Sequence, residues 1–127
     1  RRHDRDRQGR PLRKAAAEAF NSWGIPTKDC IVSVRNELEN VPLVASGGMK
    51  TGLDAAKAIT IGADIIGFAR SLLQAATDSV EEVVKVMEQI EFELKITMFG
   101  IGAKDLSELK NTNRVTVMGR SLLDRED

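Results

Sequence analysis

Val41-Pro-Leu-Val-Ala-Ser-Gly-Gly48 is a short apolar run that ends in two glycines, and Asp64-Ile-Ile-Gly-Phe-Ala-Arg70 is a second such run. The residues between them, 51–61, have the composition of a helix. Strand, glycine-rich turn, helix and strand make a βαβ unit, whose parallel strands end at the same edge of a sheet. In (β/α)₈ barrels the loops after the last two strands, at that edge, bind phosphate. We therefore expect an α/β fold with parallel strands alternating with helices, as in the C-terminal portion of a TIM (β/α)₈ barrel.

The size of the chain fits part of such a barrel. A complete barrel needs about 250 residues, whereas this chain has 127, which fits about half a barrel or some smaller α/β fold. We expect residues 1–19 to form a charged loop with a short helix, and residues 20–127 to form the C-terminal part of a barrel domain whose N-terminal part is missing. The basic segment at the start is either a solvated loop or a mobile lid for an anionic substrate.

Charge and cysteine content limit the binding partners and the cellular compartment that the chain fits. The formal net charge is zero, so no overall field favours nucleic acid or an anionic membrane. No apolar run reaches the 18 or so residues of a membrane span. The single cysteine, Cys30, excludes an internal disulfide framework and fits a reducing, cytoplasmic compartment.

Capping signals divide the chain into helices. A hydroxyl side chain before an apolar periodic segment accepts a hydrogen bond from a first-turn N–H group. The expected N-caps are Thr27, Thr51 with Asp54, and Ser79 with Glu82; the expected helix ends are Gly62, and Gly100 with Gly102 after about Phe99. Shorter helices are expected over 71–76 and 103–110, and a strand over 114–118.

The glycine pair at the first strand end is a candidate phosphate site. Gly47 and Gly48 let backbone N–H groups approach an anion, and the following helix adds the positive end of its dipole. Ser46 and Thr51 can add hydroxyl donors, and Lys50 a charge. A plain turn between strand and helix also favours glycine, but the second strand end, with its basic residue, favours a phosphate held from two sides.

Other reactive residues have structural explanations. We expect His3 at the surface, Cys30 as an unreactive thiol, and Trp23 as the anchor of a loop. Asp54 and Asp64 fit a helix cap and a strand start better than an acid–base pair. Met87, Met98 and Phe99 share a helical stripe and are expected in the core. The sequence therefore predicts no catalytic residue and no metal ligand in this chain.

Three segments resemble the C-terminal part of the type 2 isopentenyl-diphosphate Δ-isomerases. They are Phe20-Asn-Ser-Trp-Gly-Ile-Pro-Thr27, the stretch 42–58, and Leu94-Lys-Ile-Thr-Met-Phe-Gly-Ile-Gly-Ala-Lys104. The resemblance covers nearly the whole chain. The Ser-Gly-Gly turn recurs in many FMN barrels, whereas the first and last segments are far more specific.

The resemblance implies an FMN-dependent barrel enzyme of isoprenoid biosynthesis that interconverts isopentenyl and dimethylallyl diphosphate. It further implies Mg²⁺, NADPH as reductant, a small-molecule diphosphate substrate and a homo-oligomer at full length. The residues that it implies for the FMN phosphate are Gly47, Gly48, Met49, Lys50, Ala69 and Arg70. The family's flavin-ring, diphosphate and Mg²⁺ contacts match no position here.

Two other readings remain open. The first is another FMN-dependent barrel oxidoreductase, such as a relative of the 2-hydroxy-acid oxidases or dihydroorotate dehydrogenase; those oxidases place a catalytic histidine near the strand ends, where this chain has none. The second is a non-catalytic half-barrel that binds phosphate or only self-associates.

Overall fold

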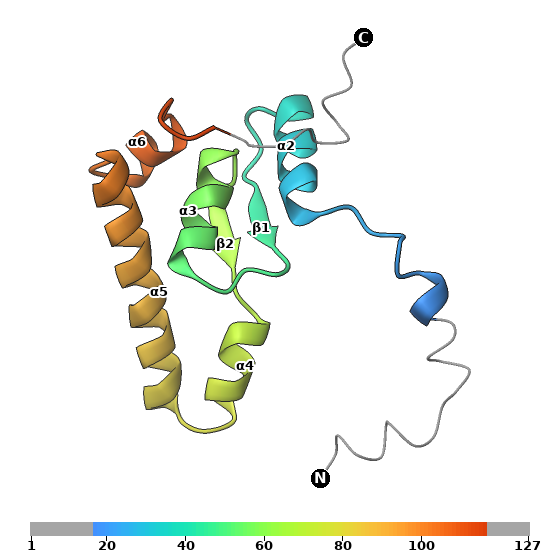
Figure 1. Ribbon diagram of the computed structural model, residues 1–127, viewed down its shortest axis with the longest axis vertical. Coiled ribbons are helices and arrows are strands. Elements are labelled where there is room, and N and C mark those ends of the chain that lie inside the picture. Colours follow the sequence, from blue (N-terminus) through green and yellow to red (C-terminus); the bar gives the residue numbers. More distant parts are fainter. Residues whose placement is uncertain (1–16, 117–127) are drawn as a thin grey trace.

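The computed structural model describes residues 17–116, and the elements below refer to that part of the chain (Figure 1). The basic segment, His3 and the C-terminal residues 117–127 lie outside it. In chain order the elements are α2 (Thr27–Glu37), β1 (Val44–Ser46), α3 (Gly52–Thr60), β2 (Ile65–Gly67), α4 (Arg70–Ala76), α5 (Val80–Ile101) and α6 (Leu106–Lys110).

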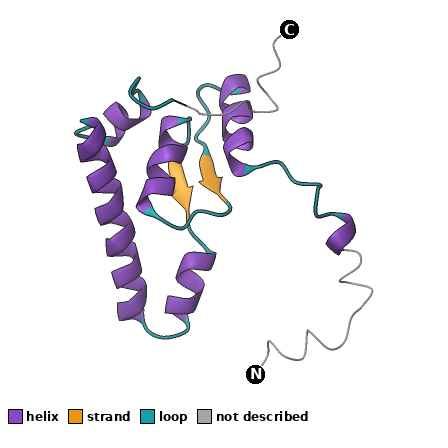
Figure 2. Ribbon diagram, viewed as in Figure 1, coloured by secondary structure: helices purple, strands orange, loops and turns teal. Residues whose placement is uncertain are grey.

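The two strands form the predicted parallel pair. Val44 lies opposite Ile65, Ala45 opposite Ile66, and Ser46 opposite Gly67. α3 connects the strands and packs on β2, α2 packs on β1, and the long α5 lies against the outer side of α3 (Figures 1 and 2). The βαβ unit expected from residues 41–70 is confirmed.

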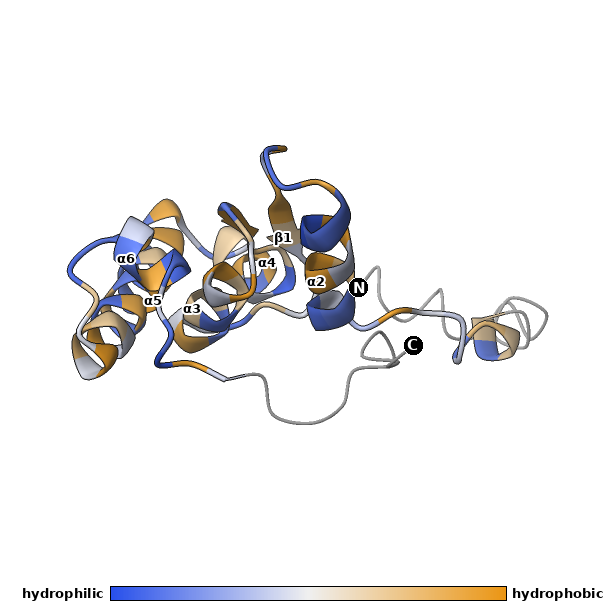
Figure 3. Cartoon of the chain, turned by 90° about the horizontal axis from the view of Figure 1, so that it is seen from above, coloured by the Kyte–Doolittle hydropathy of each residue, from blue (hydrophilic) through white to orange (hydrophobic). Residues whose placement is uncertain are grey.

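The sheet is covered on one face within the described residues. Side chains alternate along a strand, so Ala45 and Ile66 face the helices, where Ala45 is buried and Ile66 is half-buried. Val44 and Ile65 face the other way and remain 57% and 56% exposed. β1 is among the most hydrophobic segments in Figure 3. An apolar sheet face is thus open to a further layer.

Small side chains let α3 approach the sheet and its neighbours closely. Ala58 and Ala63 pack with Ile31 of α2 and with β1, and Ala56 and Ile59 pack on the other side of α3. The second group also includes Ala103 and Leu109, and Ile66 contacts both groups. Alanine keeps the helix-to-sheet distance short, which brings the start of α3 to the ends of the strands.

The predicted caps of the two central helices are confirmed. Thr51 accepts a hydrogen bond from Asp54 N, and the Asp54 carboxylate accepts one from Thr51 N, which completes a capping box. Ser79 accepts from Glu82 N at 3.1 Å and begins α5. Gly62 follows the end of α3. The short helix predicted over 71–76 is also confirmed: it is α4, which begins one residue earlier, at Arg70.

Two expected boundaries are wrong, and a third is right in part. Thr27 is the first residue of α2 rather than its cap, since Pro26 takes that place without a side-chain hydrogen bond. The expected stop at Gly100 and Gly102 is confirmed at Gly102, the left-handed residue that caps α5, whereas Gly100 lies inside the helix, which continues to Ile101. The last helix begins only after Asp105, which caps it through Glu108 N.

Two expected core residues are exposed. Met87 and Phe99 are 56% and 88% exposed, whereas Met98 packs beside the buried residues of α3 and α6. The helical spacing predicts one buried stripe, but α3 and α6 cover only part of that stripe in the described residues, so Met98 is packed and the other two are exposed. Residues 114–116 form no strand, and the remainder of the expected strand lies outside the described residues.

Arg35 fastens α2 to the start of β2. Its guanidinium donates to the carbonyl oxygens of Gly62, Leu38, Glu39 and Val41. It also forms an ion pair with Asp64, which accepts a further hydrogen bond from the backbone N–H of Leu43 and an ion pair from Lys110. Asp64 is thus confirmed as a strand-start residue with a structural role. No helix within residues 17–116 has the length and apolarity that a bilayer crossing requires.

Candidate functional site

The carboxyl ends of β1 and β2 meet at a glycine-rich loop. Gly47 and Gly48, directly after β1, have φ values of 103° and 76°, a backbone region that residues with a Cβ seldom adopt. The loop and the turn into α4 surround a cavity of about 530 Å³, which we call the strand-end cavity. Its lining residues are Ser46, Gly47, Gly48, Met49, Lys50, Gly67, Ala69, Arg70 and Ser71. All six residues that the resemblance implies for phosphate binding therefore come together there.

Several hydrogen-bond donors at this cavity are unused. Within residues 17–116 no acceptor receives the backbone N–H of Gly48, Met49, Arg70 or Ser71. The Ser71 hydroxyl oxygen is buried and has no partner in the same part of the chain. A Cβ built on Gly48 would meet no atom within 4 Å. Buried polar groups are normally hydrogen-bonded, so the Ser71 hydroxyl favours a ligand at this cavity, and the unused backbone N–H groups beside it are free to donate to an anion.

Ser71 is not among the six residues predicted from the sequence. The signal was present, because a serine directly after the second strand end, at the start of a short helix, lies beside the same edge as the glycine pair. Ser46, which was selected, donates instead to Gly67 O at 3.4 Å across the strand pair. Thr27 donates to Gly47 O at 3.0 Å, so α2 holds the first glycine of the loop from behind.

The start of α3 is not free for a ligand in the way that the sequence suggested. Two carboxylates already occupy its N–H groups. Asp54 Oδ2 accepts from Lys50 N at 3.1 Å and from Thr51 N at 3.2 Å, and Glu93 Oε2 of α5 accepts from Gly52 N at 2.7 Å. The unused donors therefore lie earlier in the loop and in the turn into α4.

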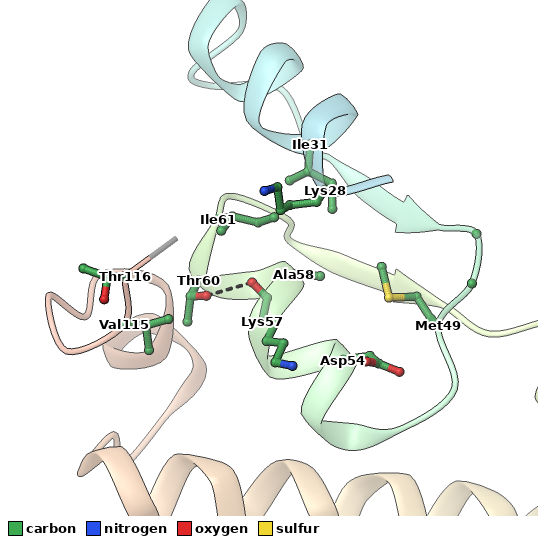
Figure 4. A pocket seen from close by; sticks show the side chains of 12 residues that line it. Lys28, Ile31, Met49, Asp54, Lys57, Ala58, Thr60, Ile61, Val115 and Thr116 are labelled. Carbon is green, nitrogen blue, oxygen red and sulfur yellow. Dashed lines mark hydrogen bonds between the residues drawn. The ribbon is translucent and has the colours of Figure 1, made fainter. Parts of the chain in front are cut away.

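A second cavity of about 560 Å³ shares Gly47, Gly48 and Met49 with the first (Figure 4). It lies between α2 and α3, and Ile31 of α2 and Ile61 at the end of α3 are among its lining residues. Its other lining residues are Lys28, Asp54, Lys57, Ala58, Thr60, Val115 and Thr116. This cavity lies on the helix side of the sheet, whereas Arg70 and the buried Ser71 hydroxyl, at the turn into α4, line the strand-end cavity and not this one.

The remaining candidates of the described part of the chain, Cys30 and Trp23, do not line the strand-end cavity. Cys30 is exposed and its thiol donates only to Ile25 O at 3.7 Å. Trp23 is 77% exposed and packs on Phe20 with a centroid distance of 5.0 Å. Among residues 17–116 no group of three or more histidine, cysteine, aspartate or glutamate side chains is arranged to hold a metal ion.

The fold and the cavity define a parallel α/β protein with a glycine-rich cradle at the carboxyl ends of adjacent strands. The sequence profile of the FMN-dependent dehydrogenase family matches residues 23–116. The chain therefore belongs to the FMN-dependent dehydrogenase family.

Curated relatives carry a more specific name. The chain is 71% identical over 115 residues to the isopentenyl-diphosphate delta-isomerase of Oceanobacillus iheyensis. The matched residues make up 91% of this chain and 33% of that relative. The chain is 44% identical over 100 residues to the enzyme of that name from Vibrio campbellii (79% and 30%). For that of Sulfurisphaera tokodaii it is 43% identical over 107 residues (84% and 28%). The resemblance found in the sequence is confirmed, and the chain spans about a third of these relatives.

Proposed function

We propose that this chain is the C-terminal portion of a (β/α)₈ barrel and supplies the phosphate-binding part of an FMN site. The loop 47–49 and the turn at Ala69 and Arg70 would hold the phosphate mainly through backbone N–H groups. The carrying observation is the set of unused donors that converge on the strand-end cavity. Since Lys50 N already donates to Asp54, Lys50 would contribute through its ammonium group.

The full-length protein is proposed to interconvert isopentenyl diphosphate and dimethylallyl diphosphate in isoprenoid biosynthesis. The names of the relatives support this activity, and they favour it over the oxidoreductase and the non-catalytic readings. The sequence's one histidine, His3, precedes the described residues. Residues 17–116 therefore contain no histidine that could serve as the base of an oxidase at the described strand ends.

The remaining parts of the proposal concern the whole protein. Reduced FMN would supply proton addition and removal at the allylic system, with NADPH as the reductant of the flavin and Mg²⁺ bound to the substrate diphosphate. The residues that bind Mg²⁺ and contact the flavin ring would lie in the rest of the protein. We further propose a cytoplasmic homo-oligomer with no nucleic-acid or membrane partner, in which residues 1–19 form a charged loop with a short helix and residues 20–127 form the C-terminal part of the barrel domain.

The test uses a full-length protein in which this chain replaces the matching third of the Oceanobacillus relative; we call it the chimaera. The 71% identity makes such a replacement conservative. The chimaera is expected to bind FMN, measured by quenching of flavin fluorescence, and to convert isopentenyl diphosphate when FMN, Mg²⁺ and NADPH are present. A folded chimaera that binds no FMN would contradict the proposal.

A further inference from the structure

A glutamate on α5 holds the first turn of α3 next to the glycine-rich loop 47–51, which we call the phosphate loop. Glu93 Oε2 accepts from Gly52 N at 2.7 Å, and Glu93 Oε1 accepts from the side-chain amide of Gln89 at 2.9 Å. These two hydrogen bonds, that of Gln89 first, keep the pKa of Glu93 below its usual value, although burial and the nearby Asp54 charge oppose the shift. Both oxygens of the carboxylate are thus engaged, and its position is fixed.

The backbones of α3 and α5 are in close approach at the same place. A Cβ on Gly52 would lie 2.2 Å from Ile90 O and 2.4 Å from Leu94 N. Only glycine permits this approach, because any side chain would push the two helices apart. The short distance is what allows the Glu93 side chain to reach the N–H of Gly52, and it leaves little freedom for the start of α3.

The phosphate loop ends where Glu93 holds the chain. Thr51 and Lys50 precede Gly52, and their N–H groups are already bound by Asp54. At the other end, Thr27 holds Gly47 O. The loop is therefore fixed at both ends by side chains from outside it, and the free N–H groups of Gly48 and Met49 lie between these two anchors.

We infer that Glu93 is a positioning residue for the phosphate of the flavin: it does not touch the ligand, but its hydrogen bond to Gly52 sets the orientation of the loop that does. This inference rests on the proposed function. The role requires a side chain at position 93 that is long enough to accept the hydrogen bond from Gly52 N. The negative charge is not required, since a second carboxylate beside a bound phosphate would only repel it.

Two conservative substitutions in the chimaera separate reach from charge. Glu93→Asp keeps the charge but is one methylene shorter, whereas Glu93→Gln keeps the length and an acceptor oxygen. Glu91→Asp is the matched control, because Glu91 lies on the same helix and pairs with Lys95 at the surface. Both Glu93 variants avoid the hole that alanine would leave beside α3, and circular dichroism checks that they fold.

The dissociation constants of FMN and of riboflavin, which lacks the phosphate, are measured by fluorescence quenching. We expect Glu93→Asp to weaken FMN binding on the order of tenfold, as for the loss of one hydrogen bond, that to Gly52 N. Glu93→Gln and Glu91→Asp should stay close to the parent, and riboflavin binding should be unchanged in every variant.

Three results would overturn the role of Glu93: FMN affinity unchanged in Glu93→Asp, an equal loss in Glu93→Gln, or a parallel loss of riboflavin binding. Gly48→Val, measured alongside, distinguishes this failure from failure of the proposed function. If Gly48→Val loses FMN while the Glu93 variants bind normally, the phosphate site stands and Glu93 has no part in it. If Gly48→Val binds FMN as the parent does, both proposals fall.

Discussion

The Arg35 guanidinium lies 2.6 Å from Asp64 Oδ2, so the last turn of α2 is joined to the residue that opens β2. Lys110 of α6 pairs with the other carboxylate oxygen. A single aspartate thus connects the two flanking helices to the amino edge of the sheet. The strand-end cavity lies at the opposite, carboxyl ends of the strands. The contacts that stabilise the βαβ unit and the cavity proposed to bind the ligand therefore lie at opposite ends of the same strands.

The Asp64 cluster should make stability depend on pH in acid. The hydrogen bond from Lys110, followed by that from Leu43 N, lowers the pKa of Asp64 from 3.8 to about 2. A carboxylate whose pKa is depressed in the folded state stabilises it fully above the unfolded pKa and loses this effect as pH falls through the folded pKa. Asp64→Asn in the chimaera should therefore lower Tm above pH 4, and the gap to the parent should close towards about pH 2.

Thermal melts at several pH values measure this gap. Glu88→Gln, on the exposed side of α5, is the control and should show a small gap that does not depend on the Asp64 cluster. A gap for Asp64→Asn that stays constant from neutral pH down to about pH 2 would contradict the linkage.

The backbone account of phosphate binding predicts a ranking of two variants. Gly48→Val should abolish most FMN binding in the chimaera, because the added side chain faces open space in the cavity region and φ is 76° at this residue. Lys50→Ala should cost about 1 kcal/mol of binding free energy, as for an exposed charge contact. Fluorescence titration with FMN decides the order, and the reverse order would mean that the lysine charge dominates.

The isolated 127-residue chain should have no isomerase activity. Its described residues hold no metal-binding cluster, and it spans about a third of its relatives. The assay incubates the purified chain with isopentenyl diphosphate, FMN, Mg²⁺ and NADPH, with the chimaera as positive control. Any conversion above the protein-free background would falsify this prediction.

The isolated chain should also self-associate. Val44 and Ile65 lie side by side on the open face of the sheet and are more than half exposed, and both strands have unpaired edges within the described residues. Such edges and faces favour further pairing. Sedimentation at micromolar concentration should show oligomers or aggregates, whereas the Val44→Lys variant should shift the distribution towards monomer. A monodisperse parent that melts cooperatively as a monomer is the contrary outcome.

The sequence predicted the local framework because its signals act over a few residues. The capping box of Thr51 and Asp54, the strand pair and the short α4 all follow from adjacent residue types. The same locality explains the error at Thr27. A hydroxyl before a helix usually caps it, but here the hydroxyl reaches Gly47, 20 residues away, and no local pattern shows such a partner.

The less predictable part of the site depends on contacts between distant segments. Glu93 follows Gly52 by 41 residues, and in the sequence it is one of many acids on a charged helix. Its role becomes visible only when α5 packs on α3. Met87 and Phe99 show the converse, since their helical spacing indicated a core, yet spacing alone cannot say how many faces of a helix are covered in the described part of the chain.

The residues that line the strand-end cavity all lie between Ser46 and Ser71, which has a consequence for the order of folding. Closing so short a stretch costs little chain entropy, and units rich in local contacts form fast. We expect the backbone amides of α3 and both strands to gain protection from hydrogen exchange before those of more distant contacts. A ligand phosphate that binds this early unit would then draw the rest of the chain towards the native state by mass action.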